Sequence, residues 1–168
     1  LEMGLPFLIL LNMWDEAKSR GIEIQTQILS QLLGVPVLKT VATRRKGVEK
    51  IKENLHTQPP SSVSVLYPEV IEEGVARVTP LLPETPISKR SIALMLLSGD
   101  ESLNEWLHQN LSEEEIRKID RIRQEIQAHF VDPIGYLINQ ARLRKGNELL
   151  QQVMKAGKGA ARNLSTIM

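Results

Sequence analysis

Two polar side chains stand at the end of a short apolar run near the beginning of the sequence. The run covers residues 6–11, and Asn12 and Asp15 follow it. A run of this length is too short to cross a membrane and is typical of a buried strand in a parallel sheet. In open α/β sheets, ligands bind outside the carboxyl ends of the strands. We therefore expect Asn12 and Asp15 to lie where a ligand can bind.

A carboxylate and an amide at such a position can recognise the edge of a guanine base. The Asp15 carboxylate would accept hydrogen bonds from guanine N1–H and from the exocyclic amine, a donor pair that adenine lacks on that edge. A site built to bond such a group rejects an analogue without it by up to roughly 10⁴–10⁵. Asn12 would tie its loop to neighbouring backbone and help to hold the base. The alternative interpretation is that Asp15 only caps a helix, because Asp is a good N-cap residue.

A second strand is predicted after one helix. The helix begins at Gln25 or Thr26 and ends at Leu33, where the following glycine makes a C-terminal stop, and an apolar strand covers residues 35–40. The order of strand, helix and strand implies parallel strands joined by a right-handed crossover.

The loop that follows this second strand should share an edge of the sheet with the first polar pair. Val41, Ala42 and Thr43 leave the strand here. We expect them beside Asn12 and Asp15, because the carboxyl ends of parallel strands meet at one edge. The small Ala42 would let a backbone N–H approach the guanine carbonyl oxygen.

The rest of the chain is predicted to be helical. Residues 58–67 form a boundary rich in Pro and Ser, with a possible short edge strand over 63–67. An antiparallel helical bundle is expected over 68–156, with a basic tail over 157–168. Ser112 and Glu115 have capping-box spacing, the clearest helix-start signal in the chain.

These motifs resemble the ferrous iron transport protein B (FeoB) family. The stretches that carry the resemblance lie in both halves of the chain, in the family's order: residues 11–17, 33–37, 41–44 with Gly47, 98–100, 132–133 and 140–142. The resemblance implies an α/β fragment of a P-loop GTPase sheet over residues 1–57, followed by an all-α helical bundle. GTP or GDP would be the ligand. Met13 replaces the Lys that most GTPases carry and would cover the base with its thioether.

The expected nucleotide site contains seven residues. They are Asn12, Met13, Trp14, Asp15, Val41, Ala42 and Thr43. No Gly-x-x-x-x-Gly-Lys-Ser/Thr occurs in the sequence, so magnesium ligands and a phosphate-binding loop are expected to lie outside this chain. On this interpretation the chain begins within a G domain, and by itself it is not expected to hydrolyse GTP.

Composition limits the other functions. Lys and Arg number 21 against 20 for Asp and Glu, which gives no signal for nucleic acid. The three His are scattered and Cys is missing from the sequence, so no metal site is expected. No stretch approaches the roughly 18 apolar residues of a membrane span.

The resemblance also implies partners and a location. A membrane domain of the same polypeptide would follow the basic tail, which would place the chain at the cytoplasmic face of the cell membrane. The helical part would slow nucleotide dissociation and relay nucleotide state to the pore. Open strand edges favour a homo-oligomer. The alternative is a helical docking or oligomerisation module that binds no nucleotide.

Overall fold

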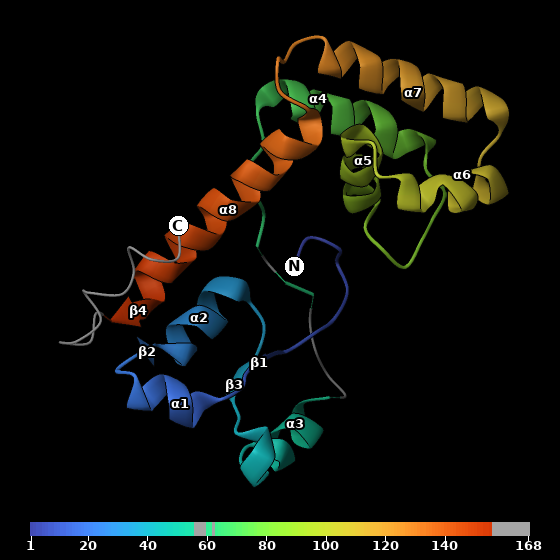
Figure 1. Ribbon diagram of the computed structural model, residues 1–168. Helices are drawn as coiled ribbons and strands as arrows, with labels where there is room; N and C mark the ends of the chain where they lie inside the picture. Colours follow the sequence, from blue (N-terminus) through green and yellow to red (C-terminus); the bar gives the residue numbers. More distant parts are fainter. Residues whose placement is uncertain (56–59, 62, 156–168) are drawn as a thin grey trace. The chain divides into compact units, whose positions relative to one another are not determined.

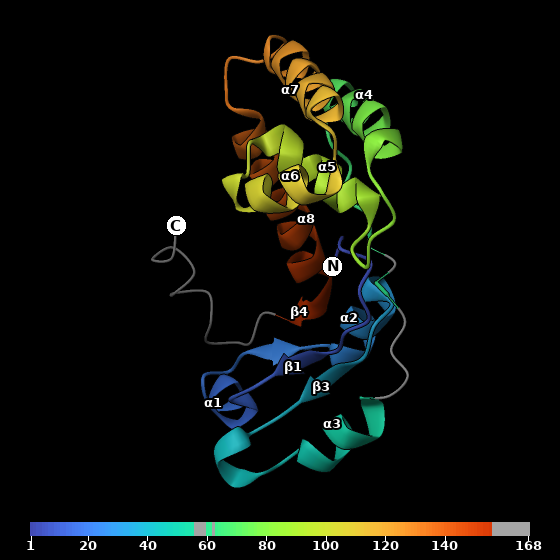
Figure 2. The same cartoon turned by 90° about the vertical axis from the view of Figure 1, so that its right-hand side faces the viewer.

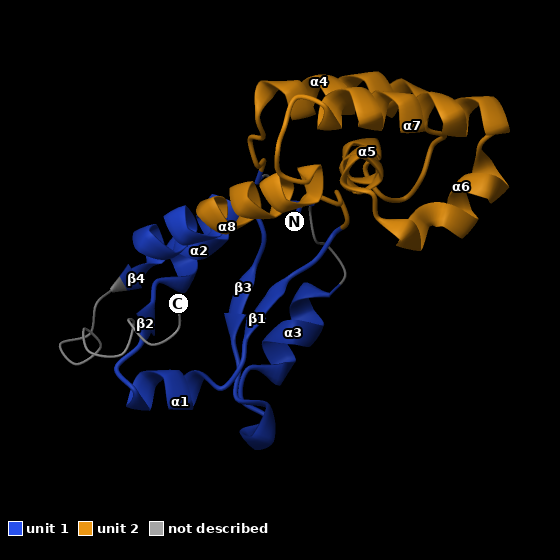
Figure 3. Ribbon diagram, turned by 45° about the horizontal axis from the view of Figure 1, so that its top comes forward, with its two compact units in different colours: residues 1, 6–63, 146–168 blue, residues 2–5, 64–145 orange. Residues whose placement is uncertain are grey.

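The computed structural model describes residues 1–55, 60–61 and 63–155, and within these ranges the chain divides into two compact units (Figure 3). The strand unit consists of residues 1, 6–63 and 146–168, and the helical unit of residues 2–5 and 64–145. The expected basic tail over 157–168 lies outside the described residues.

The strand unit is built from short strands and helices (Figure 1). In chain order its elements are β1 (Ile9–Leu11), α1 (Trp14–Ser19), β2 (Glu23–Ile24), α2 (Thr26–Leu33), β3 (Val37–Lys39), η1 (Ala42–Arg44), α3 (Val48–Asn54) and β4 (Met154–Lys155). A parallel pair is formed by β1 and β3, and β2 pairs with β4 in antiparallel fashion.

The predicted strand–helix–strand unit is confirmed. In the parallel pair, Leu11 lies opposite Lys39. The connecting helix α2 packs against β3 and ends at Gly34, which has a φ of 68°, the left-handed conformation that glycine adopts without penalty. Leu33 and Val35 are buried on either side of this glycine. The two strands therefore end at the same edge, as the sequence indicates.

The prediction that β1 is buried on both faces is wrong for the described residues. Leu10 keeps 43% of its surface exposed, and Ile9 and Leu11 are only partly buried. The physical reason is the width of the sheet, since β1 has β3 as its one partner among the described strands. A sheet of two strands is too narrow for helices to pack on and bury both of its faces.

The helical unit packs helices around one apolar core. Its elements are α4 (Glu69–Val78), η2 (Thr79–Leu81), α5 (Lys89–Ser98), η3 (Glu101–Leu103), α6 (Asn104–Asn110), α7 (Glu113–Gln127) and the part of α8 (Ile134–Val153) up to residue 145. Figure 2 shows α4 and α7 lying side by side, and both also contact α5. Buried Ile, Leu and Val side chains from these helices form the core.

Local start and stop signals bound two helices of the helical unit, and the capping box at the start of α7 was predicted from the sequence. Ser88 caps α5 by accepting from Ser91 N–H at 3.2 Å, and Gly99 ends that helix in the left-handed conformation. At the start of α7, Ser112 and Glu115 form the reciprocal capping box. Each cap satisfies backbone groups that a helix end leaves without an intrahelical partner.

No strand forms over residues 63–67, so that prediction is wrong. The alternation is real, because Val65 and Tyr67 are buried while Leu66 is exposed. The backbone, however, is bonded by side chains instead of by a neighbouring strand. Arg90 donates to the Val65 carbonyl at 3.2 Å, and Tyr67 N–H donates to Glu72 at 3.2 Å.

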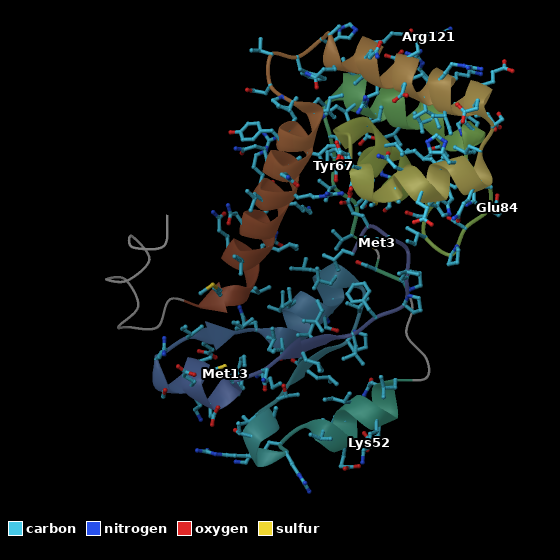
Figure 4. The ribbon with its side chains drawn as sticks, turned by 45° about the vertical axis from the view of Figure 1, so that its right-hand side comes forward. Met3, Met13, Lys52, Tyr67, Glu84 and Arg121 are labelled. Atoms are coloured by element: carbon cyan, nitrogen blue, oxygen red, sulfur yellow. The ribbon has the colours of Figure 1, made fainter. Side chains whose placement is uncertain are left out.

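Tyr67, labelled in Figure 4, also anchors the first residues of the chain within the helical unit. Its hydroxyl donates to the Glu2 carboxylate, with oxygen distances of 2.7 and 2.9 Å, and Arg142 Nε donates to the same carboxylate at 2.8 Å. Burial, reinforced by Glu2, raises the pKa of Tyr67 well above its usual range. The phenol therefore stays protonated and keeps donating.

The ion pair between Glu72 and Arg90 should make the stability of the helical unit depend on pH. Arg90 donates to the two Glu72 oxygens at 2.6 and 2.7 Å and holds the pKa of that carboxyl below its ordinary 4.5. A depressed pKa gives stability that is present above pH 4.5 and is lost as pH falls through the folded value. We expect Glu72→Gln to lower the free energy of unfolding by about 1 kcal/mol at pH 7, with the loss shrinking towards pH 3.

Urea unfolding followed by circular dichroism between pH 7 and pH 3 measures this difference. The matched control is Glu73→Gln, which removes the neighbouring exposed carboxylate. A Glu72→Gln loss of the same size at pH 3 as at pH 7 would contradict the ion-pair account.

Candidate functional site

The loops after β1 and β3 leave the sheet side by side. Beyond the last paired residues, Thr40 N–H donates to the Leu11 carbonyl at 3.0 Å, and Trp14 N–H donates to the Thr40 carbonyl at 3.2 Å. The two chains therefore stay bonded to each other past the ends of both strands. The polar residues that follow each strand are brought to one place.

Asn12 joins the two loops through a single oxygen atom. Its Oδ1 accepts the backbone N–H of Ala42 at 3.1 Å and the hydroxyl of Thr40 at 3.3 Å. Thr40 is only 4% exposed, so its hydroxyl depends on a protein partner. The predicted tie from Asn12 to neighbouring backbone is thus present.

Helix α1 begins immediately after this tie. Met13 occupies its N-cap position with a φ of 57°, a left-handed conformation that is uncommon for a residue other than glycine. The Met13 side chain is 57% exposed and is labelled in Figure 4. Asp15 lies inside the first turn of α1, so it is not the N-cap residue of the alternative interpretation.

The Asp15 carboxylate has a different partner for each oxygen. Oδ1 accepts Glu16 N–H at 3.0 Å, at the helix end where anions are stabilised. Oδ2 lies 3.3 Å from Nη1 of Arg44. The side chains of Asp15 and Arg44 are 40% and 64% exposed, so their ion pair is a weak one.

The loop after β3 is closed into a tight turn. Val41 and Lys46 exchange both backbone hydrogen bonds, at 3.1 and 3.2 Å, and Arg45 inside this turn has a φ of 53°. Gly47 follows with a φ of 85°, and a Cβ there would meet the Lys39 carbonyl oxygen at 2.5 Å. A residue other than glycine would therefore both strain the turn and clash with the strand.

Trp14 takes no part in lining the site. The Nζ of Lys39 lies 4.2 Å from the centre of the Trp14 ring, a cation–π contact with a residue of β3. Although it sits between Met13 and Asp15 in the sequence, Trp14 is missing from the lining of the pocket that those residues form. It supports the sheet edge from beside the loop.

The two loops and α1 enclose an open pocket of about 630 Å³. It is lined by Asn12, Met13, Asp15, Glu16, Ser19, Val41, Ala42, Thr43 and Arg44. Six of the seven predicted residues thus lie together around one cavity, and Trp14 is the exception.

Three lining residues were missed from the sequence. Glu16 and Ser19 lie on α1, and Ser19 is four residues after Asp15, so helical spacing would have placed it on the same face. Arg44 ends η1, and its place next to the predicted Thr43 in the sequence was the available signal.

Among the described residues, no helix has the length and apolarity that a membrane span requires. Within the same ranges, no three His, Asp or Glu side chains come together as a group that could hold a metal ion.

The chain was compared with known proteins. Residues 1–55 match the family model of ferrous iron transport protein B, and residues 67–155 match that of the FeoB cytosolic helical domain. The Fe(2+) transporter FeoB of Escherichia coli is 33% identical over 106 residues. A Fe(2+) transport protein A/Fe(2+) transporter FeoB fusion protein of Porphyromonas gingivalis is 29% identical over 117 residues.

These alignments cover 60% and 63% of this chain, respectively, and 14% of the length of either relative. Among solved structures, NFeoB from S. thermophilus bound to GDP·AlF4⁻ and K⁺ is 25% identical, with a TM-score of 0.75. That match covers 89% of this chain and 60% of the other.

The match to NFeoB, with the parallel strand pair, the pocket at its carboxyl edge and the helical unit, assigns the chain to part of a G domain with an attached helical domain. The FeoB cytosolic helical domain model alone matches more than half of the 168 residues. The chain belongs to the FeoB family.

Removal of the Asn12 side chain should release the two loops from each other. Asn12→Ala leaves the buried Thr40 hydroxyl without its partner, and we expect a loss of about 1–2 kcal/mol in the free energy of unfolding. Asn12→Asp keeps an acceptor oxygen at the same place and should recover most of that loss. Urea unfolding gives the stability, and NMR hydrogen exchange at the Ala42 amide reports the tie itself. An Asn12→Ala variant with native stability and unchanged exchange at Ala42 would show that the tie is unimportant.

Proposed function

We propose that the pocket between the two loops binds the guanine base of GTP or GDP. The observation that supports it most is the Asn12 tie, because it holds the loop of Asp15 and the loop of Ala42 around one cavity. The solved NFeoB relative is described as bound to GDP·AlF4⁻ and K⁺, which agrees with a nucleotide ligand.

In this proposal Asp15 is the base reader. Its carboxylate accepts N1–H and the exocyclic amine of guanine, and its place in the first turn of α1 leaves it partly exposed at the pocket. Met13, with 57% of its surface exposed at the pocket, covers one face of the base. Val41 and Thr43 complete the wall around Ala42.

For the guanine carbonyl we propose a contact other than the Ala42 backbone N–H that the sequence suggests. Ala42 N–H already donates to Asn12, so it is engaged within the protein. The Asn12 side chain uses its oxygen in this tie, which leaves its amide nitrogen to donate to the base. We therefore assign the donor role to Asn12 and give Ala42 the role of a small residue that leaves room.

We further propose that the chain serves a ferrous iron transporter at the cytoplasmic face of a membrane. This proposal divides the chain into part of a G domain, a linker, a helical domain and a basic tail, over residues 1–57, 58–67, 68–156 and 157–168. It also includes a membrane domain of the same polypeptide and self-association of the chain. The helical unit would slow nucleotide dissociation.

The base preference of the chain tests the proposal. Nucleoside monophosphates that differ only in the base report the contribution of the base to binding. Isothermal titration calorimetry of the 168-residue chain should show a preference for GMP over AMP and XMP. Asp15→Asn puts a donor where guanine also has donors, so GMP affinity should fall by about 10- to 100-fold. The same change should improve binding of XMP, because xanthine carries a carbonyl in place of the exocyclic amine.

The matched control is Glu23→Gln, which neutralises an exposed carboxylate that does not line the pocket and should keep the preference for GMP. Equal affinity of the native chain for GMP and AMP would overturn the proposal and leave the helical docking module as the better account.

A further inference from the structure

We propose that Arg44 is an internal competitor of guanine for the Asp15 carboxylate. The inference rests on the proposed function, since it concerns the same pocket. It adds a residue that limits how strongly guanine is preferred, and this residue is none of the seven predicted from the sequence.

The position of Arg44 is fixed by the turn that carries it. Its N–H donates to the Val41 carbonyl at 3.0 Å, and the next N–H, that of Arg45, donates to the Ala42 carbonyl at 3.1 Å. The Val41–Lys46 bridge closes the same turn. The backbone therefore holds Arg44 at the rim of the pocket, with its guanidinium 3.3 Å from Asp15 Oδ2.

The chemistry of the guanidinium explains the competition. A guanidinium presents N–H donors in a planar fork that matches a carboxylate. Guanine presents the same kind of edge through N1–H and its exocyclic amine. Asp15 Oδ1 accepts Glu16 N–H and keeps a second lone pair, whereas Oδ2 faces Arg44, so guanine must displace the guanidinium from Oδ2 in order to donate to both oxygens. Adenine offers no such donor pair and leaves the ion pair in place.

Removal of Arg44 should therefore raise the affinity for guanine and leave that for adenine unchanged. The pair is exposed, with side-chain exposures of 64% and 40%, and such pairs change an equilibrium by up to about 5-fold. We expect Arg44→Gln to raise the ratio of GMP to AMP affinity by about 2- to 5-fold. Screening by salt should raise the native ratio in the same direction and leave the Arg44→Gln ratio unchanged.

Arg45→Gln is the matched control. It removes one positive charge from the next residue, which is exposed and is not among the residues that line the pocket. The use of a ratio between two monophosphates cancels the effect of either change on the phosphate.

Calorimetric titration of GMP and AMP into the native chain and both variants, at low and high salt, gives the test. A ratio that rises in Arg44→Gln and stays native in Arg45→Gln supports the competition. A ratio that falls in Arg44→Gln would make Arg44 a contact to the base, and an unchanged ratio would make it a spectator. Either result overturns the inference about Arg44, but the proposed function stands as long as the native chain still prefers GMP. A native ratio of one would instead overturn the proposed function.

Discussion

One amide oxygen, Oδ1 of Asn12, governs the geometry of the candidate site. Among the described residues, backbone hydrogen bonds between the two loops end with those that Thr40 makes to Leu11 and Trp14, and no such bond reaches Ala42. By accepting from both Thr40 and Ala42, Asn12 keeps them together over the next residues. This tie holds the loop of Asp15 next to the turn that carries Arg44, so the proposed base recognition and the proposed competitor both depend on it.

Much of the fold follows from local signals in the sequence. The capping box at Ser112, the cap at Ser88 and the glycine stops at Gly34 and Gly99 each satisfy helix ends through neighbouring residues, so they can be recognised without the tertiary structure. The pairing of β2 with β4 could not be predicted, because two-residue strands far apart in the sequence leave no periodic pattern. The alternation over 63–67 was misleading for a related reason: side chains of Arg90 and Glu72, instead of a strand, bond that backbone.

The candidate site shows the same division between local and distant causes. The rule that ligands bind at the carboxyl ends of parallel strands placed Asn12, Asp15 and residues 41–43 around one pocket. Trp14 does not line the pocket because its ring contacts Lys39, a partner that only the register of β3 reveals. Arg44 was missed because the direction of its side chain depends on the closing turn, which includes a residue with a left-handed backbone. Recognition of guanine by this pocket remains a prediction.

The most direct measurement is an NMR titration of the ¹⁵N-labelled chain with GMP and, separately, with AMP. The account predicts that GMP shifts the backbone amides of residues 13–16 and 42–44 together, along one binding curve, because the Asn12 tie makes them one site. AMP at the same concentrations should leave those amides nearly unmoved. Shifts confined to one loop, or equal shifts with AMP, would contradict the claim that these two strand ends form a single guanine-reading pocket.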